Sequence, residues 1–524
     1  MKSPTRSSSN FHKGRIYALT LNASLGFAFW GYYFSIFNSL QEYLEKYIFP
    51  DISTTQISFI ASSLDLGAIL GSLLAGIFVS KWGRRKTMIA ADIVGIIGST
   101  LTLIAVFEVM LFGRLVSGFV GGVNTVVVAM YLVELSPLSM CGATGSLSII
   151  VLELLAFLSL VLGFAVPSVP KGGVSSQIWR ILLWIPAFLN IIRLLCLTVF
   201  FRYDTPFYCI EKNKKEEAMK ALSNVFKSNV PQEYERIAHD VETTTFDGVV
   251  RFKDLFRNVY RKGFLISLIL AMLQQFCGTG AVFVFSNDIF SKSTSNPVLY
   301  STLLGVINLL AVIVSFKFIE KFGRRTLIIF GVISIGVLLL TFGLIAALYS
   351  ESSPILKFLL ICWPIFYQAS LGSLTFLYIS ETLPDVGVGF CTSANWLSGF
   401  LISQFYLQSV EKFGLGVPFI FFACLCFVCA VIFSKNLVET KEKTKTEIIA
   451  AYSKISAAQV APINEDFGPH GDEVIINNRR EQRDAEVLDS EIELPERNHE
   501  EPQIVITLNT QQSSKNLLTP KNVN

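Results

Sequence analysis

Charged residues are scarce in this chain of 524 residues. Asp, Glu, Lys and Arg make up 16% of it, whereas hydrophobic residues make up 52% and the mean hydropathy is +0.53. An ordinary soluble domain carries about a quarter charged residues, so this composition excludes one. The chain is expected to lie in a lipid bilayer.

Several chemical signatures of enzymes and pumps are also missing. The sequence has no Gly-Lys-Ser/Thr loop for nucleotide phosphates, no metal-spaced His/Cys cluster and no set resembling a catalytic triad. Its histidines all fall outside the apolar runs, which excludes a histidine proton relay in the membrane. They are His12, His239, His470 and His499. We therefore expect neither an enzyme nor a nucleotide-driven pump, and no cofactor, metal or nucleic-acid partner.

Long apolar runs are what the sequence has in abundance. A run of about 20 residues crosses the hydrocarbon core, and twelve are centred near residues 28, 68, 98, 122, 155, 190, 275, 309, 338, 368, 398 and 426. They predict an all-α membrane protein with twelve transmembrane helices in two six-helix halves, residues 16–201 and 263–437. Residues 202–262 predict a linker of short amphipathic helices, and residues 438–524 are too hydrophilic to form a core and predict a disordered tail.

Lysine and arginine gather on one side of the predicted spans. They occur in residues 1–15, in the loops 81–86 and 321–325, in the linker and in residues 441–445, whereas the opposite loops hold only three lysines. By the positive-inside rule the basic side is cytoplasmic. We expect a multi-pass protein of the plasma membrane or an internal membrane, with both termini in the cytoplasm.

Two motifs occur twice, at nearly the same separation. Lys81-Trp-Gly-Arg-Arg-Lys86 matches Lys321-Phe-Gly-Arg-Arg325, and Tyr131-Leu-Val-Glu-Leu-Ser-Pro137 matches Tyr378-Ile-Ser-Glu-Thr-Leu-Pro384. The duplication therefore covers a whole half of the protein. Such internal symmetry in a hydrophobic chain is typical of transporters built from two halves.

These motifs, in register with others, resemble the sugar porter family of the major facilitator superfamily. The others are Gly113-Arg114, Gln274-Gln275-Phe-Cys-Gly278, Asn395-Trp396 and Glu439-Thr440-Lys441. The resemblance runs from about residue 20 to residue 447. It implies a substrate site near mid-membrane that is exposed to alternate sides and a sugar or related polyol as substrate. The sequence does not fix the oligomeric state, and we expect the monomer to be functional.

The resemblance assigns substrate contacts to polar and aromatic residues between the halves. Amides both donate and accept hydrogen bonds, which suits a polyol; alternatively, they join helices to one another. The assigned residues are Gln274, Gln275, Asn308, Gln368, Phe376, Asn395 and Trp396.

Other family positions have lost their polar groups. The family's span 5 glutamine falls on Ile149, its span 7 asparagine on Gly280, a span 11 asparagine on Gly399 and its span 10 tryptophan on Phe376. These changes put glucose in doubt and leave another hexose, a polyol and a non-sugar metabolite open.

Charged residues at the cytoplasmic helix ends are expected to control the conformation. Arginines there can pair with carboxylates and with C-terminal helix carbonyls, and such contacts would tie the halves together when the cytoplasmic side is closed. The alternative is that the arginines only anchor the topology. The set is Arg84, Arg85, Arg324 and Arg325 with Glu134, Glu320 and Glu381, and Arg114 is expected to pair with Glu134 or another carboxylate.

The first span bears on energy coupling. Proton-coupled members of the family carry an Asp after Gly-Tyr, but here the triplet is Gly31-Tyr32-Tyr33, so facilitated diffusion is expected. Asp65 or Glu153 could instead carry a proton in a symporter, because carboxylates at membrane depth are usually functional. Asp92 is interpreted as structural and close to the interface. A solute sensor that signals through its tail remains a further alternative, and the tail is a candidate for binding cytoplasmic partners.

Overall fold

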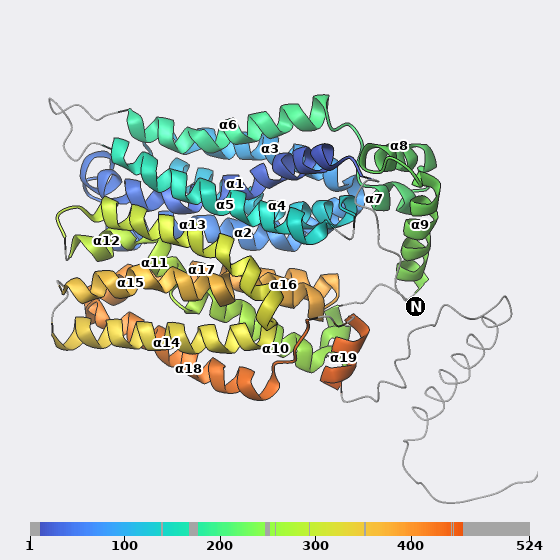
Figure 1. Cartoon of the computed structure of the whole chain (residues 1–524). Helices are drawn as coiled ribbons and strands as arrows, with labels where there is room; N and C mark the ends of the chain where they lie inside the picture. Colours follow the sequence, from blue (N-terminus) through green and yellow to red (C-terminus); the bar gives the residue numbers. More distant parts are fainter. Residues whose placement is uncertain are drawn as a thin grey trace, which may run out of the picture. The chain divides into compact units, whose positions relative to one another are not determined.

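The computed structural model describes residues 11–137, 140–166, 177–246, 252–256, 258–292, 294–349, 353–441, 443 and 445–453. Within these residues twelve long helical segments form a bundle (Figure 1). Ten of them are long and apolar enough to cross a membrane. The other two are α1 and α3, of which α3 carries three basic residues and an aspartate. The predicted all-α, twelve-helix architecture is confirmed.

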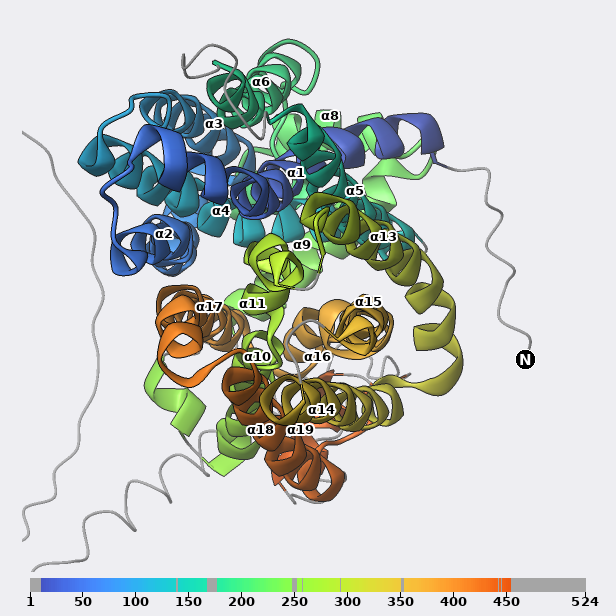
Figure 2. The ribbon, with the colours of Figure 1, turned by 90° about the vertical axis from the view of Figure 1, so that its left-hand side faces the viewer.

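The N-terminal half consists of six long helices, and the first continues into a short π-helix. Figure 2 views the bundle from its end and shows these helices grouped on one side of it. Their bounds are α1 Lys13–Tyr43 with η1 Leu44–Ile48, α2 Thr54–Trp82, α3 Arg84–Leu101, α4 Phe107–Leu135, α5 Cys141–Leu162 with η2 Gly163–Ala165, and α6 Ile178–Val199.

The C-terminal half repeats this pattern, but two of its spans are broken. The seventh span consists of α10 and α11, and the tenth consists of α15, the π-helix η5 and α16. The bounds are α10 Asn258–Phe276, α11 Thr279–Val284, α12 Ser286–Ser291, α13 Pro297–Phe322, α14 Arg324–Leu348, α15 Pro354–Tyr367, η5 Gln368–Gly372, α16 Ser373–Thr382, α17 Asp385–Phe413 and α18 Gly416–Asn436.

The linker between the halves is helical, as its amphipathic pattern indicates. It holds α7 Pro206–Glu211, α8 Lys215–Val225, α9 Val230–Phe246 and the 3-10 helix η4 Phe252–Phe256. Helices α7 to α9 lie at the right-hand end of the bundle in Figure 1, which we call the linker side; the opposite end is the far side.

The segment after α18 differs from the prediction. Residues 438–524 were expected to be disordered, but α19 spans Lys445–Ser453 and packs on α10 and α16. Ile448 and Tyr452 on α19 are 1% and 4% exposed. Few apolar residues suffice here because a surface formed by other helices covers them. Residues 454–524 of the predicted tail and residues 1–10 of the predicted N-terminus lie outside the described residues.

Hydrogen bonds that join the two halves run from the far side to the middle of the bundle. At the far end, Asn38 in α1 donates to Ser286 Oγ at 2.9 Å, and Thr54 at the start of α2 donates to Glu411 in α17. Nearer the middle, the hydroxyls of Ser72 in α2 and Ser393 in α17 lie 3.1 Å apart. The halves are therefore in direct contact along the far part of their boundary.

Candidate functional site

Two breaks in regular α-helix position the candidate amides. Helix α10 ends just after Gln274 and Gln275, and the chain turns at Gly278, whose φ of 92° suits glycine because it has no β-carbon. In the tenth span, the π-helix η5 begins at Gln368. Breaks of this kind within a span are frequent at functional sites.

Asn395 of α17 holds the first group of amides together. Its Nδ2 donates to Gln274 Oε1 at 2.6 Å and to the carbonyl oxygen of Ala271 at 2.7 Å, and its Oδ1 accepts from Gln275 Nε2 at 3.1 Å. All three amide side chains are buried. These bonds do join helices, yet Gln275 Oε1 has no partner among the described residues.

A second group connects the halves at mid-bundle. Glu153 of α5 accepts from Asn308 Nδ2 at 2.6 Å and from Gln368 Nε2 at 2.9 Å, and Gln368 Nε2 also lies 2.9 Å from Asn308 Oδ1. The carboxylate comes from the N-terminal half and both amides come from the C-terminal half. Glu153 thus accepts from the amide donors that a hydroxyl oxygen of a bound polyol would otherwise use.

Asp65 forms a third contact across the boundary. Its Oδ2 accepts from the hydroxyl of Ser403 in α17 at 3.0 Å. Arg114 in α4 does not pair with it: Arg114 Nε donates to the carbonyl oxygen of Ile60 at 2.7 Å, and its guanidinium lies 4.7 Å from the ring centre of Phe37. Among the described residues Arg114 therefore forms no hydrogen bond or close ion pair with a carboxylate, and its buried Nη1 has no hydrogen-bond partner.

The candidate aromatic residues occupy different surroundings. The ring centres of Trp396 and Trp30 lie 4.5 Å apart at an interplanar angle of 60°, so this edge-to-face pair also spans the two halves. Phe376 is 37% exposed and lies in α16, beyond η5 toward the linker side. The amides and Trp396 thus meet at the boundary between the halves, whereas no hydrogen bond or ring contact among the described residues joins Phe376 to them.

Comparisons with known proteins agree with this architecture. The sequence profile of the family described as "Sugar (and other) transporter" matches residues 20–452. The chain belongs to the sugar transporter family. Its relatives include Hexose transporter 1 of Plasmodium knowlesi, 28% identical over 82% of this chain and 91% of the relative. They also include the facilitated glucose transporter member 1 of solute carrier family 2 from Gallus gallus, 26% identical over 85% of this chain and 95% of the relative.

Solved structures show the same fold. The proton:xylose symporter XylE bound to 6-bromo-6-deoxy-D-glucose has a TM-score of 0.71 at 21% identity, covering 84% of this chain and 99% of that chain. The partially occluded inward open conformation of XylE from E. coli has a TM-score of 0.71 at 21% identity, and the match covers 82% of this chain and 100% of that chain. Like other members of the sugar transporter family, this chain is an integral multi-pass membrane protein.

The duplicated motifs of this family member form matching networks on the linker side. In the N-terminal half, Arg84 Nη2 lies 2.5 Å from Glu134 Oε1, and Thr205 donates to Glu134 Oε2 at 2.6 Å. The carboxylate of Asp204 accepts from the backbone N–H groups of Arg84 and Arg85 at 3.1 Å. The Arg85 side chain donates to the backbone carbonyl oxygens of Leu197, in the last turn of α6, and of Phe201, just beyond it.

The C-terminal half repeats each of these contacts. Arg324 Nη2 lies 2.9 Å from Glu381 Oε1, and Thr440 donates to Glu381 Oε2 at 2.6 Å. Glu439 accepts from the backbone N–H groups of Arg324 at 2.9 Å and Arg325 at 3.0 Å. Glu439 and Thr440, after the last span, thus form the same hydrogen bonds as Asp204 and Thr205 form after the sixth span.

The two carboxylates that follow the spans differ in the direction of their pKa shifts. Burial raises the pKa of Asp204 above its usual value, although three N–H donors oppose this. Burial alone would also raise the pKa of Glu439, but four backbone N–H donors outweigh it and lower the pKa below the usual value. The pKa values of carboxylates at equivalent positions in the two halves are therefore shifted in opposite directions.

The networks correct one part of the expected gate. Each Arg–Glu pair lies within its own half, and so does not tie the two halves together as predicted. The reason is geometric, because each arginine follows the short turn between two adjacent helices of one half and meets the end of a third. The side chain of Glu320, in α13, lies outside the described residues.

One buried ion pair was missed by sequence reasoning. Asp92 was placed near the interface, but Asp92 Oδ1 lies 2.6 Å from Arg193 Nη2 in α6, and both side chains are 0% exposed. Arg193 Nη2 also donates to Asn124 Oδ1 at 2.9 Å. The charged Arg193 within the sixth apolar run was the signal that could have revealed the pair, since a cation at that depth needs a partner.

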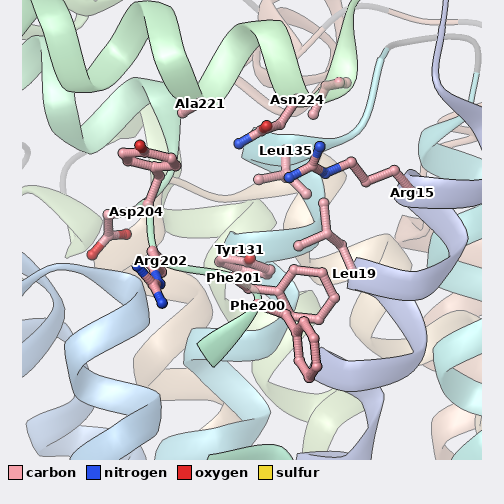
Figure 3. Close-up of a pocket in the computed structure, with 12 residues that line it drawn as sticks. Arg15, Leu19, Tyr131, Leu135, Phe200, Phe201, Arg202, Asp204, Ala221 and Asn224 are labelled. Atoms are coloured by element: carbon pink, nitrogen blue, oxygen red, sulfur yellow. The ribbon is translucent and has the colours of Figure 1, made fainter. Parts of the chain in front are cut away.

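A separate shallow pocket opens on the linker side of the N-terminal half (Figure 3). It lies between α1, α4, α8 and the segment after α6, with Arg15 reaching over Leu135 toward Asn224. Because Tyr131 and Leu135 belong to the last turns of α4, this pocket is distant along the bundle from the amide groups. It is distinct from the candidate substrate site.

Proposed function

We propose that the protein carries a hexose or a related polyol across the membrane by alternating access, as a facilitator. One observation carries the proposal. Amide and carboxylate groups from both halves meet at mid-bundle, where Glu153 of the N-terminal half accepts from Asn308 and Gln368 of the C-terminal half. A polyol that replaces these bonds would connect to both halves, and its binding would favour one arrangement over the other. The relatives named hexose and facilitated glucose transporters support this substrate class.

Facilitated diffusion is favoured by the first span. Tyr33 stands where proton-coupled members carry an Asp, and its hydroxyl lies 3.1 Å from Thr102 Oγ1. The carboxylate that carries the proton in those members is therefore absent from this position. We further propose that the linker side faces the cytoplasm, because the basic residues gather there.

Uptake by proteoliposomes tests the proposal. Labelled hexoses, pentoses and polyols should enter saturably, equilibrate and ignore an imposed proton gradient. Gln274→Ala and Asn308→Ala should each lower uptake by about tenfold, the effect of one or two lost hydrogen bonds to substrate, while the protein stays folded. Unchanged uptake by both variants would remove this site from consideration.

Proton-coupled symport is the second candidate, and Glu153 is the observation that favours it. A carboxylate that contacts both halves would change its contacts on protonation, which could link proton transfer to the conformational change. Gradient-driven accumulation that Glu153→Gln abolishes would establish symport. Accumulation that survives in Glu153→Gln would turn attention to Asp65.

A further inference from the structure

Gly399 of α17 faces polar side chains from both halves. A β-carbon at Gly399 would lie 3.4 Å from Cδ of Gln275 in α10 and 3.5 Å from both Cγ and Oδ1 of Asp65 in α2. An amide of the C-terminal half and a carboxylate of the N-terminal half therefore converge on one backbone position. The resemblance places an asparagine at this position in the family, and glycine here leaves room between the two groups.

The Asp65 carboxylate and the Gln275 amide each have one oxygen that accepts no hydrogen bond from the described part of the chain. The Asp65 side chain is 2% exposed; its Oδ2 accepts from Ser403, but its Oδ1 has no donor. Gln275 is 6% exposed, and its Oε1 has none either. Buried acceptors without donors are unfavourable. Arg114 forms no hydrogen bond with Asp65: its Nε and Nη2 donate to backbone carbonyls of α2, and its buried Nη1 has no partner among the described residues.

We propose that Asp65 is a substrate-binding residue that supplies, from the opposite half, the polar group lost at Gly399. The inference rests on the proposed function and deepens it. Asp65 Oδ1 and Gln275 Oε1 are both acceptors, so the part of the substrate between them donates two O–H groups. Adjacent hydroxyls of a sugar or polyol meet this requirement. Their binding connects α2 of one half to α10 of the other.

A double-mutant cycle, in which one change is made in the protein and the other in the sugar, tests this assignment. Inhibition of uptake is measured for every monodeoxy and monofluoro derivative of a transported sugar, with the wild-type protein and with Asp65→Ala. For the wild type, losing the hydroxyl that faces Asp65 should weaken binding about 10- to 100-fold, as for a hydrogen bond to a charged group. The fluoro derivative should be as weak as the deoxy derivative, because fluorine cannot donate.

In Asp65→Ala the penalty at that one hydroxyl should fall below about threefold, while penalties at the other positions persist. Adding Gly399→Asn to Asp65→Ala should restore part of the penalty at that hydroxyl, because the asparagine amide then lies near the position of the lost carboxylate. Ser72→Ala is the matched control: it removes another hydrogen bond between α2 and α17 and should leave every penalty unchanged. If Asp65→Ala does not fold, Asp65→Asn replaces it and should reduce the same penalty.

If the penalty for losing each hydroxyl is the same in the Asp65 variants as in the wild type, this inference is overturned, whereas the proposed function still stands. Failure of the wild type to transport any sugar or polyol would overturn the proposed function, and this inference with it.

Discussion

At the scale of single residues, the pair formed by Asp92 and Arg193 is enclosed by the helices of the N-terminal half. A buried ion pair contributes little net stability, because desolvation offsets the attraction, but removing one partner leaves an uncompensated charge. Gly26 of α1 lies directly against the guanidinium, so that a β-carbon there would overlap Arg193 Nη1. The side chain of Arg193 is therefore fixed by packing as well as by charge.

We expect Asp92→Leu to lower the free energy of unfolding by about 3–5 kcal/mol. The double variant Asp92→Leu with Arg193→Met should recover most of this loss, because the charge that lacked a partner is gone. Denaturant unfolding of the purified protein in detergent measures both. A double variant no more stable than Asp92→Leu alone would contradict this account.

A second prediction at this scale concerns how the carboxylates of Asp204 and Glu439 make stability depend on pH. The raised pKa of Asp204 means that the folded state binds its proton more tightly than the unfolded state does, so stability relative to Asp204→Asn falls as pH rises above about 4. The lowered pKa of Glu439 means the reverse, so stability relative to Glu439→Gln is lost as pH falls below about 4.

Melting temperatures of the wild type and both variants between about pH 3 and pH 6 measure these differences. The two differences should change in opposite directions as pH falls. Parallel trends would show that the two networks, despite their matching geometry, hold their carboxylates in similar environments.

At the scale of elements, α19 is an unexpected part of the folded unit. The hydroxyls of Tyr452 in α19 and Tyr378 in α16 lie 2.5 Å apart, and Tyr378 also donates to the carbonyl oxygen of Val438 at 2.9 Å. These contacts join α19, α16 and the irregular segment that follows α18. They hold the segment that carries Glu439 beside the N-terminus of α14.

A chain ending at residue 440 should therefore be less stable than one ending at residue 453. Exposing the side chains of Ile448 and Tyr452 should cost about 3 kcal/mol, and Tyr452→Phe in the longer chain, which loses only the hydroxyl, about 1 kcal/mol. Thermal unfolding in detergent compares the three proteins. Equal stability of the two shortened chains would show that α19 contributes nothing to the fold.

At the scale of the whole molecule, the far side of the boundary is closed by Asn38. Its Nδ2 donates to Ser286, and its Oδ1 accepts from the backbone N–H of Asn287 at 2.8 Å. A carrier that works by alternating access must break such contacts when the far side opens. Their strength therefore helps to set the population of the conformation described here.

We expect Asn38→Ala to shift the equilibrium about 10- to 100-fold toward the arrangement open on the far side, because two hydrogen bonds are lost. Spin labels introduced as non-canonical amino acids at Asp51 and Lys412 would report a longer distance, and this route avoids labelling the nine native cysteines. Ser409→Ala removes only a bond within α17 and should leave the distance unchanged. An unaltered distance in Asn38→Ala would contradict a role in closure.

Much of the fold was predictable because span formation depends on local sequence. An apolar run long enough to cross the bilayer becomes a helix wherever it packs, and the two repeated motifs showed that six helices form each half. The linker helices followed from their amphipathic pattern. Helix α19 did not, because its few apolar residues are buried only by α10 and α16, which are far away in the sequence.

The sequence by itself therefore determined the membrane setting, the helix count, the duplication and the residue types available for a sugar site, since all of these depend on composition and spacing. Only the tertiary structure decided which polar groups meet. It placed the Arg–Glu pairs within the halves, buried Asp92 against Arg193 and set Asp65 opposite Gly399. A hydrogen bond requires its donor and acceptor to lie within about 3 Å, so which of the partners distant in the sequence meet is decided by how the helices pack.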